Sequence, residues 1–347
     1  MSELEQSWYS ISPAGTVAIG NLTPVGQNSG QVDCRWPPNG HQLAACLNLP
    51  TDCTLCGPFW YLSNPGRIYV ILPLPVYELE RSPQKKKKQK IPPEIFRMVW
   101  EENRWQVQSQ HRDASIEVVG GRYLISGITL KQLWRDGSRK EPDLQEFPWQ
   151  KLTLSHNSRE EFEVKDEGGF FAEKTTLMDP GWSILVKIIG NYDWQQRLPN
   201  PPWSCIGAGA TPVSIKREDE EDLTVDWLEG KAESFQGTGA VLLTGALWYE
   251  EENFLSVPYP AQVPIAGYAA EVGIPWQSWK SVRDRHNPER KVQVLTPGEW
   301  LTPAGAVYLW EGEAPLETSA PLPDRHHRHC LGYGHLWLFE EKQNNGN

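Results

Sequence analysis

The chain has 347 residues, a length that suits two ordinary domains better than one. Its net charge of −11 argues against a general coat for nucleic acids, although a local basic groove is compatible with an acidic total. No apolar run approaches the roughly 18 residues of a membrane span, and the first six residues are mostly polar, so we expect a cytoplasmic protein with reduced cysteines.

Strand-like patterns dominate the chain. Short β-branched and aromatic runs lie between turns, and the sequence has 29 Gly and 29 Pro residues. Helical periodicity is weak almost everywhere. We therefore expect an α+β fold that is rich in strands, with a few short helices and long loops.

The first 80 residues alternate short apolar runs with turns. Residues 7–11 and 67–74 have strand patterns, and residues 41–49, which follow two prolines, are the best helix candidate. Residues 81–93 carry five lysines between prolines and cannot bury apolar surface, so they predict a mobile basic loop. Such a loop is either simply solvated or a flexible arm that binds phosphate groups.

Residues 94–200 continue the strand-rich pattern. Strands are predicted at 120–125 and 181–189, and a short helix at 128–133 leads into a basic turn at 135–140. The polar, Gly-containing residues 159–171 predict a projecting hairpin, which would form an insertion over residues 155–175.

The proline-rich residues 199–202 predict the junction between an N-terminal domain, residues 1–200, and a C-terminal domain, residues 201–347. In the second domain, strands are predicted at 240–249 and 306–310. The acidic residues 219–226 begin a helix or an exposed loop, and solvation explains them better than a metal site. Residues 218–222 would suit the basic surface of a protein partner.

Two groups of potential metal ligands stand out. Cys53 and Cys56 form a C-x-x-C pair, but the obvious second pair is missing, and Cys34, Cys46 or His41 would have to complete a zinc site. Packed or surface thiols are the simpler interpretation. The run 326–330 (HHRHC) offers imidazoles, yet adjacent residues rarely converge on one ion without help from elsewhere. A solvated loop, or one that touches RNA phosphates, explains the run better, so we expect no metal or other cofactor.

The sequence contains no recognisable catalytic motif. Paired carboxylates, a Walker-type phosphate loop and a nucleophile elbow are all missing. Eight histidines would allow a metal-independent ribonuclease, but no two of them stand in a recognisable catalytic arrangement.

The region from 276 to 336 carries the strongest functional signal. Trp276 and Trp279 lead into the basic segment 280–291, which is followed by a Pro-Ala-Gly turn at 303–305 and a Gly-rich turn at 331–334. Glycines let an RNA backbone approach peptide N–H groups, aromatic rings stack on unpaired bases, and lysine and arginine pair with phosphates. A hairpin with aromatic core residues is the structural alternative.

At this point the chain resembles a known family. Ser278-Trp279, residues 303–307 (PAGAV) and residues 331–334 (LGYG) occur in the order typical of the RAMP-superfamily subunit that caps the crRNA 5′ end in type III-B (Cmr) CRISPR effector complexes. The N-terminal residues 36–45 (WPPNGHQLAA) are similar to the proline-rich start of that family's first helix. Further short similarities occur at 66–69, 72–75 and 205–209.

Two departures indicate either a divergent member of that family or a related handle-binding subunit of another type III system. The family's N-terminal signature contains arginines, whereas residues 19–25 (IGNLTPV) contain none, so no role passes to those positions. The Ser-Gly-Trp triplet lacks its glycine, because Gln277 precedes Ser278-Trp279.

The resemblance implies two ferredoxin-like (RRM-like) domains and no catalysis. The subunit would bind the crRNA 5′ handle, contact the large polymerase/cyclase subunit and the backbone RAMP subunits, and lie near the target RNA in antiviral defence. The hairpin at 159–171 would then wedge against the guide–target duplex.

The residues that we expect to bind RNA come from the start of the first helix, the basic turn, the basic segment and the Gly-rich turn. They are Asn39, Gly40, His41, Arg135, Arg139, Lys140, Lys280, Arg283, Arg285, His286, Arg290, Lys291, Gly332, Tyr333 and Gly334. The alternative is a metal-independent endoribonuclease of the same superfamily that processes CRISPR repeat RNA, with His41 or His286 as the catalytic group. A metal-organised adaptor without RNA contact is a third hypothesis.

Overall fold

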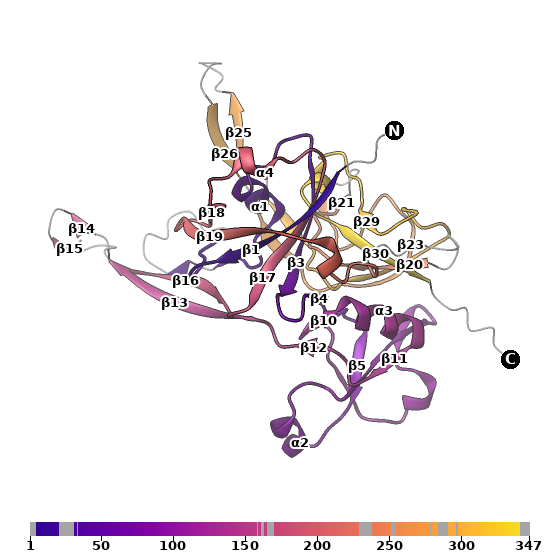
Figure 1. Ribbon diagram of the computed structural model, residues 1–347. Helices are drawn as coiled ribbons and strands as arrows, with labels where there is room; N and C mark the ends of the chain where they lie inside the picture. The colour runs from indigo at the N-terminus through magenta and orange to yellow at the C-terminus, as the bar shows by residue number, and fades with distance from the viewer. Residues whose placement is uncertain are drawn as a thin grey trace.

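The computed structural model describes residues 5–20, 31–32, 34–157, 159–160, 163–164, 170–228, 238–250, 255–277, 279–283, 291–295 and 298–340. Strands dominate this part of the chain, as Figure 1 shows, and its α-helices are short. These helices are α1 (Gly40–Cys46), α2 (Pro83–Lys88), α3 (Gly127–Asp136) and α4 (Trp194–Arg197). The strand-rich α+β prediction is therefore confirmed. None of the helices in the described ranges is long and apolar enough to cross a membrane.

An antiparallel sheet of eight strands forms the centre of the molecule. Its strands, in spatial order, are β12 (Leu144–Gln145), β10 (Leu124–Ser126), β4 (Arg67–Ile71), β3 (Thr54–Leu62), β17 (Trp182–Ile189), β1 (Gln6–Pro13), β19 (Thr211–Glu218) and β18 (Trp203–Ile206). The predicted strands at 7–11 and 181–189 become β1 and β17, which pair along their length. Both are buried on two faces; β17 is a nearly continuous apolar run, whereas β1 combines Trp8, Tyr9 and Ile11 with buried serines.

Successive side chains of these central strands enter two different cores. On β1, Trp8 belongs to the core shared with the C-terminal part of the chain, whereas Tyr9 belongs to the core under α1. Leu185 and Val186 on β17 divide in the same way. Because side chains alternate along a strand, one sheet can thus separate two hydrophobic cores.

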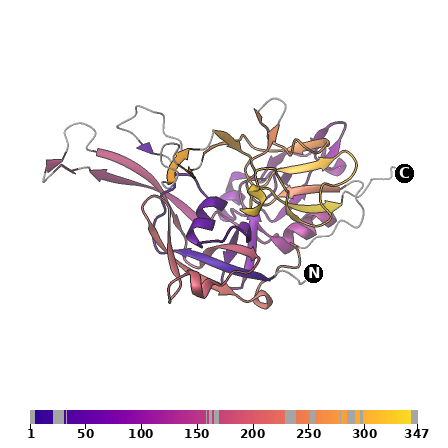
Figure 2. The same ribbon diagram turned by 90° about the horizontal axis from the view of Figure 1, so that it is seen from above.

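A second sheet of five strands covers one face of the first (Figure 2). Its strands, in spatial order, are β23 (Ile265–Ala269), β28 (Val307–Trp310), β20 (Thr238–Leu242), β30 (His335–Glu340) and β29 (Ala320–Pro321). Val241, Val307 and Trp337 from this sheet lie in the same core as Trp8. The strand predicted at 240–249 ends at Leu242 in the structure.

The eight-stranded sheet extends past the junction expected at 199–202. Strands β18 and β19 follow that junction in sequence, and β19 pairs with β1. The second large sheet begins only at Thr238. The division of the chain into two ferredoxin-like modules stays a prediction.

The structure around a four-stranded sheet differs from the prediction for residues 135–140 and for residues 81–93. This sheet consists of β11 (Ser138–Lys140), β6 (Glu94–Arg97), β5 (Val76–Leu79) and β9 (Ile116–Val118). Residues 135–140 are not one basic turn: Arg135 and Asp136 are the last residues of α3, Gly137 caps the helix with a φ of +79°, and the rest is β11. Residues 81–93 are not wholly a loop, because α2 forms there and Lys86 pairs with Glu117.

A long hairpin projects from the body of the molecule. Strands β13 (Trp149–Asn157) and β16 (Phe170–Met178) pair in a continuous register, and β14 (Arg159–Glu160) and β15 (Glu163–Val164) pair beyond them. Figures 1 and 2 both show this hairpin extending from the body. The insertion predicted over residues 155–175 overlaps this hairpin, whose first strand begins at Trp149.

The remaining elements are small. The strands are β2 (Gln31–Val32), β7 (Val99–Glu101), β8 (Arg104–Gln106), β21 (Tyr249–Glu250), β22 (Leu255–Ser256), β24 (Ile274–Trp276), β25 (Trp279–Arg283), β26 (Lys291–Leu295) and β27 (Glu299–Leu301). Three 3-10 turns occur in the described part of the chain: η1 (Ser109–His111), η2 (Glu220–Asp222) and η3 (Arg328–Cys330). The tail after residue 341, which we expect to fray, lies outside the described residues.

Candidate functional site

The start of α1 is fixed by a reciprocal capping box. The side chain of Asn39 accepts a hydrogen bond from the backbone N–H of Gln42 at 3.2 Å, and the Gln42 side chain accepts one from the N–H of Asn39 at 2.9 Å. This pairing satisfies two N–H groups that a helix start otherwise leaves open. The side-chain oxygen of Asn39, a predicted RNA ligand, thus already has a structural partner.

The glycines at the start of α1 and in the C-terminal turn let two chain segments touch. A Cβ on Gly40 would lie 1.7 Å from the carbonyl oxygen of Leu331. Gly332 has a φ of +80°, and a Cβ there would lie 2.3 Å from the carbonyl oxygen of Gly57. From the sequence we expect RNA to approach these glycines closely, whereas in the structure their close neighbours are other segments of the chain.

His41 and Tyr333 connect the same two segments. His41 Nδ1 lies 3.0 Å from the hydroxyl oxygen of Tyr333, and the Trp276 ring packs against both side chains. Tyr333 is 6% exposed, so it presents no ring face to solvent. Burial, and secondarily the charge of Arg328, lowers the pKa of His41 to about 4, which keeps the imidazole neutral at pH 7.

We predict that this partly buried histidine makes the fold sensitive to acid. The pKa of His41 is about 4 in the folded chain, compared with 6.5 for an exposed histidine. Between these values the unfolded chain binds a proton that the folded chain does not, so stability falls as pH drops from 6.5 towards 4. Urea denaturation of wild type and His41→Gln at pH 7 and pH 5 measures this change.

The substitution should reduce the pH dependence without abolishing it. Burial lowers the pKa of His335 to about 3, so this second histidine acts in the same direction. Replacement of the exposed His326 by glutamine is the matched control and should leave the pH dependence unchanged. An equal pH dependence in wild type and His41→Gln would contradict the prediction.

A cavity of about 500 Å³ lies beside these contacts and is lined by segments that are far apart in the sequence. They are the start of α1, the foot of the long hairpin, the Pro-Ala turn and the Gly-rich turn. The lining includes Arg35, Trp36, Asn39, Gly40, Trp60, Phe147, Trp149, Lys151, Thr244, Trp276, Pro303, Ala304, Gly332 and Tyr333. A wider groove of about 850 Å³ along residues 89–93 and 141–148 contains none of the predicted RNA-binding residues.

One wall of the cavity is aromatic. The ring centroids of Trp60 and Trp149 are 4.4 Å apart, and Phe147 stacks on Trp149 at 4.7 Å with an interplanar angle of 16°. Trp36 stacks on Trp60 at 6.0 Å. Sequence reasoning missed Trp60, Phe147 and Trp149; the high tryptophan content was a signal, but it did not say which rings meet.

The cavity also has polar groups that a ligand could use. The indole N–H of Trp36 is buried and has no hydrogen-bond partner within the described part of the chain. Lys151 is exposed at the rim, and the guanidinium of Arg35 donates to the backbone oxygens of Gly20 and Gln277. An apolar cavity with a few polar groups is the usual form of a binding site.

Comparisons with known proteins give a weak structural likeness. No protein-family profile matches the chain, and no curated protein matches it. A chain of the type III-B Cmr-beta complex bound to cognate target RNA is similar, with 10% identity, a TM-score of 0.44, and coverage of 87% of this chain and 86% of that one. A chain of the Csm3-Csm4 subcomplex of the type III-A CRISPR-Cas interference complex is also similar, with 10% identity, a TM-score of 0.34, and coverage of 88% and 94%.

The basic segment forms a second projecting hairpin, away from the cavity lining. β25 and β26 pair antiparallel from Trp279 and Leu295 to Arg283 and Lys291. Lys280 lies on β25. Arg285, His286 and Arg290 lie outside the described residues. The RNA-binding role of this segment stays a prediction.

The predicted basic patch at 135–140 lies at another end of the molecule. Figure 1 shows β11 far from β25 and β26. Arg135 is exposed and forms an ion pair of 2.8 Å with Asp136, and Arg139 and Lys140 lie on β11. The structure does not bring this patch and the cavity together.

The structure corrects the acidic surface that we predicted at residues 218–222. Glu218 is 7% exposed and accepts hydrogen bonds from Ser10 Oγ at 2.6 Å and Lys216 Nζ at 2.7 Å. It therefore cannot contribute to a surface for a protein partner, whereas the neighbouring residues of η2 are exposed.

Cys53 and Cys56 are both buried free thiols, so they are packed rather than at the surface. Burial raises the pKa of Cys56 to about 11.

Proposed function

We propose that this chain is a non-catalytic, RNA-binding subunit of a type III CRISPR effector complex and that its cavity holds an unpaired nucleotide of the crRNA 5′ handle. The observation that carries this proposal is the lining of that cavity. The motifs at 36–40, 303–304 and 332–333, which are distant in the sequence and carry the family resemblance, all line it.

The chemistry of the cavity suits a base that is turned out of a stack. Trp36 and Trp149 are partly buried rings of the aromatic wall that can offer stacking faces, and the buried Trp60 packs against both of them. Lys151 and Arg35 supply positive charge for a phosphate. Single-stranded RNA is recognised by this combination of stacking and backbone contacts.

The finer assignment follows the family resemblance. The chain would consist of two ferredoxin-like modules, hold the handle beside the β25–β26 hairpin, and contact the large polymerase/cyclase subunit and the backbone RAMP subunits. The β13–β16 hairpin would extend towards the guide–target duplex. Trp149 and Lys151 lie at the foot of this hairpin and also line the cavity, so one element would serve both contacts.

The test is RNA binding by a variant of the aromatic wall. Trp149→Ala should weaken binding of a short single-stranded RNA with the repeat-derived 5′ sequence by roughly tenfold, because stacking is worth about 1–3 kcal/mol per base. Fluorescence anisotropy with labelled RNA measures the dissociation constant. Trp203→Ala is the matched control, because Trp203 is 51% exposed on the edge strand β18.

Equal binding by Trp149→Ala and wild type would contradict the use of the cavity. The same RNA, incubated with the chain without metal, tests the absence of catalysis. We expect the RNA to remain intact, since His41 is partly buried and its Nδ1 already contacts the Tyr333 hydroxyl. Site-specific cleavage that His41→Ala or His286→Ala abolishes would favour the endoribonuclease instead.

A further inference from the structure

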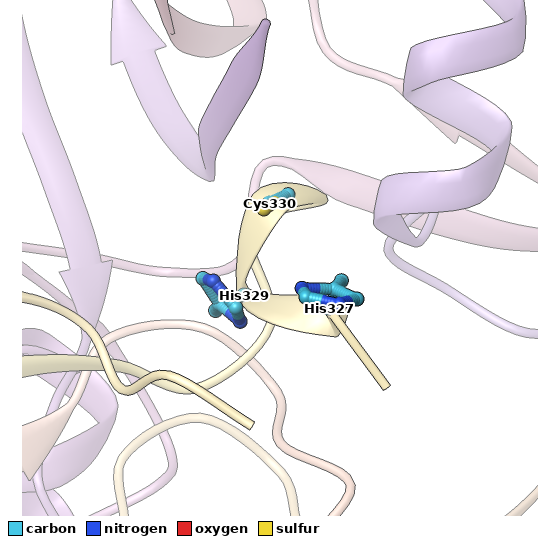
Figure 3. A group of neighbouring side chains, drawn as sticks. All are labelled: His327, His329 and Cys330. Carbon is cyan, nitrogen blue, oxygen red and sulfur yellow. The ribbon is translucent and has the colours of Figure 1, made fainter. Parts of the chain in front are cut away.

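The turn that precedes the Gly-rich motif gathers three potential metal ligands. His327, His329 and Cys330 each offer one ligand atom, and these atoms lie within 4.8 Å of one another. Figure 3 shows the three side chains at one short turn: His327 is the residue before η3, and His329 and Cys330 lie in it. It is the one such group in the described part of the chain. His327 is exposed, and the other two are partly buried, so an ion could enter from solvent.

The Asp324 side chain stabilises the turn on which the neighbouring ligands lie. Its carboxylate accepts hydrogen bonds from the backbone N–H of His326 at 2.7 Å and of His329 at 2.9 Å. His327 has a φ of +55°, so the chain reverses there. The ligands at 327, 329 and 330 are thereby held on one tight turn, which lowers the entropy that an ion would have to remove.

The same carboxylate can orient a ligand histidine. His329 Nδ1 lies 3.1 Å from the backbone N–H of Asp324, which donates to it, and 3.2 Å from Asp324 Oδ2. If His329 binds an ion through Nε2, its proton must be on Nδ1, and Asp324 Oδ2 then accepts from Nδ1 in place of the bond from the backbone N–H. A carboxylate behind a metal-binding imidazole is the common arrangement in metalloproteins.

Arg328 lies between the ligands His327 and His329 in the sequence, and Glu299 compensates its positive charge. Arg328 directs Nη2 towards Glu299, at 2.7 Å from Oε1 and 2.9 Å from Oε2. This ion pair is largely buried and holds the guanidinium on a carboxylate. A divalent cation at the turn therefore does not face an unpaired arginine.

We propose that η3 is a binding site for one zinc ion, with His327, His329 and Cys330 as ligands and a fourth position open to water or to a partner chain. Two imidazoles and a thiolate are ligands that zinc prefers, and three protein ligands with one open position are an established coordination set for it. The site is independent of the RNA-binding proposal, because neither histidine lines the cavity.

Metal titration of the purified full-length chain tests the site. After treatment with a chelator, zinc is titrated against a chromophoric competitor, and cobalt replaces it for absorption spectroscopy. We expect one equivalent of metal per chain and a thiolate-to-cobalt charge-transfer band. His327→Ala and His329→Ala should each weaken zinc binding by about tenfold or more, and Cys330→Ser should remove the charge-transfer band.

His326→Ala is the matched control, because His326 is the adjacent histidine outside the group of ligands. It should bind zinc as wild type does. The proposal is overturned if wild type binds less than one equivalent, if His326→Ala weakens binding as much as His327→Ala, or if Cys330→Ser keeps the charge-transfer band. Asp324→Asn gives a second readout: it keeps an oxygen for the turn but loses the acceptor for Nδ1, so affinity should fall about tenfold.

Discussion

Replacing Gly40 by alanine should lower the free energy of unfolding by about 3 kcal/mol, at the upper end of the cost of overpacking a core. The added Cβ would lie 1.7 Å from the carbonyl oxygen of Leu331, and backbone cannot rotate away as a side chain can. Helix propensity alone predicts the opposite sign, because alanine is favoured over glycine in a helix by about 1 kcal/mol. Urea denaturation followed by tryptophan fluorescence measures the difference.

Gly209→Ala is the control for this prediction. No atom lies within 4 Å of the position that its Cβ would occupy, so its stability should stay within about 0.5 kcal/mol of wild type. If Gly40→Ala is as stable as Gly209→Ala, then α1 does not pack against Leu331 as described. A large loss of stability in Gly40→Ala alone would instead show that the contact between α1 and the segment around Leu331 stabilises the fold.

The elements that the sequence predicts well are those whose pattern is local. Residues 181–189 are a nearly continuous apolar run, and residues 7–11 carry three large apolar side chains; they become the two-sided central strands β17 and β1. The helix predicted from 41 begins at Gly40, because Asn39 and Gln42 complete a capping box within four residues. In these cases the deciding contacts lie within a few positions of one another.

The cavity could not be predicted because its walls come from distant segments. Trp36 and Trp149 are more than a hundred positions apart in the sequence, and Tyr333 joins them from near the C-terminus. Local patterns fix which face of a strand is apolar but not which strands become neighbours. Trp36 and Tyr333 could be recognised in two separate motifs of the sequence, but nothing in those motifs places them around one cavity with Trp149.

Glycine residues show a second reason why contacts could not be predicted from the sequence. Gly332 was interpreted as a site where RNA approaches the backbone, and its φ of +80° does require glycine. The sequence shows that something comes close to such a residue, but it does not show what. Here the neighbour is Gly57 of the central sheet, and so the same motif that carries the family resemblance also joins the two halves of the chain.

Removal of Glu299 should destabilise the fold by about 3 kcal/mol, because breaking a buried ion pair leaves one charge without compensation. The Glu299 and Arg328 side chains are only 11% and 17% exposed, and Arg328 Nη2 contacts both carboxylate oxygens. In Glu299→Ala the guanidinium stays near His41 without its counter-charge. Urea denaturation of the variant at pH 7 measures the loss.

Arg104→Ala is the matched control, since the Arg104–Glu102 pair has a similar length of 3.0 Å but its side chains are 67% and 76% exposed. Exposed pairs contribute about 0–1 kcal/mol, so this variant should be nearly as stable as wild type. Comparable losses in Glu299→Ala and Arg104→Ala would mean that water reaches Arg328. A large difference between the two variants would mean that burial, rather than the number of ion pairs, determines how firmly η3 is held against the rest of the fold.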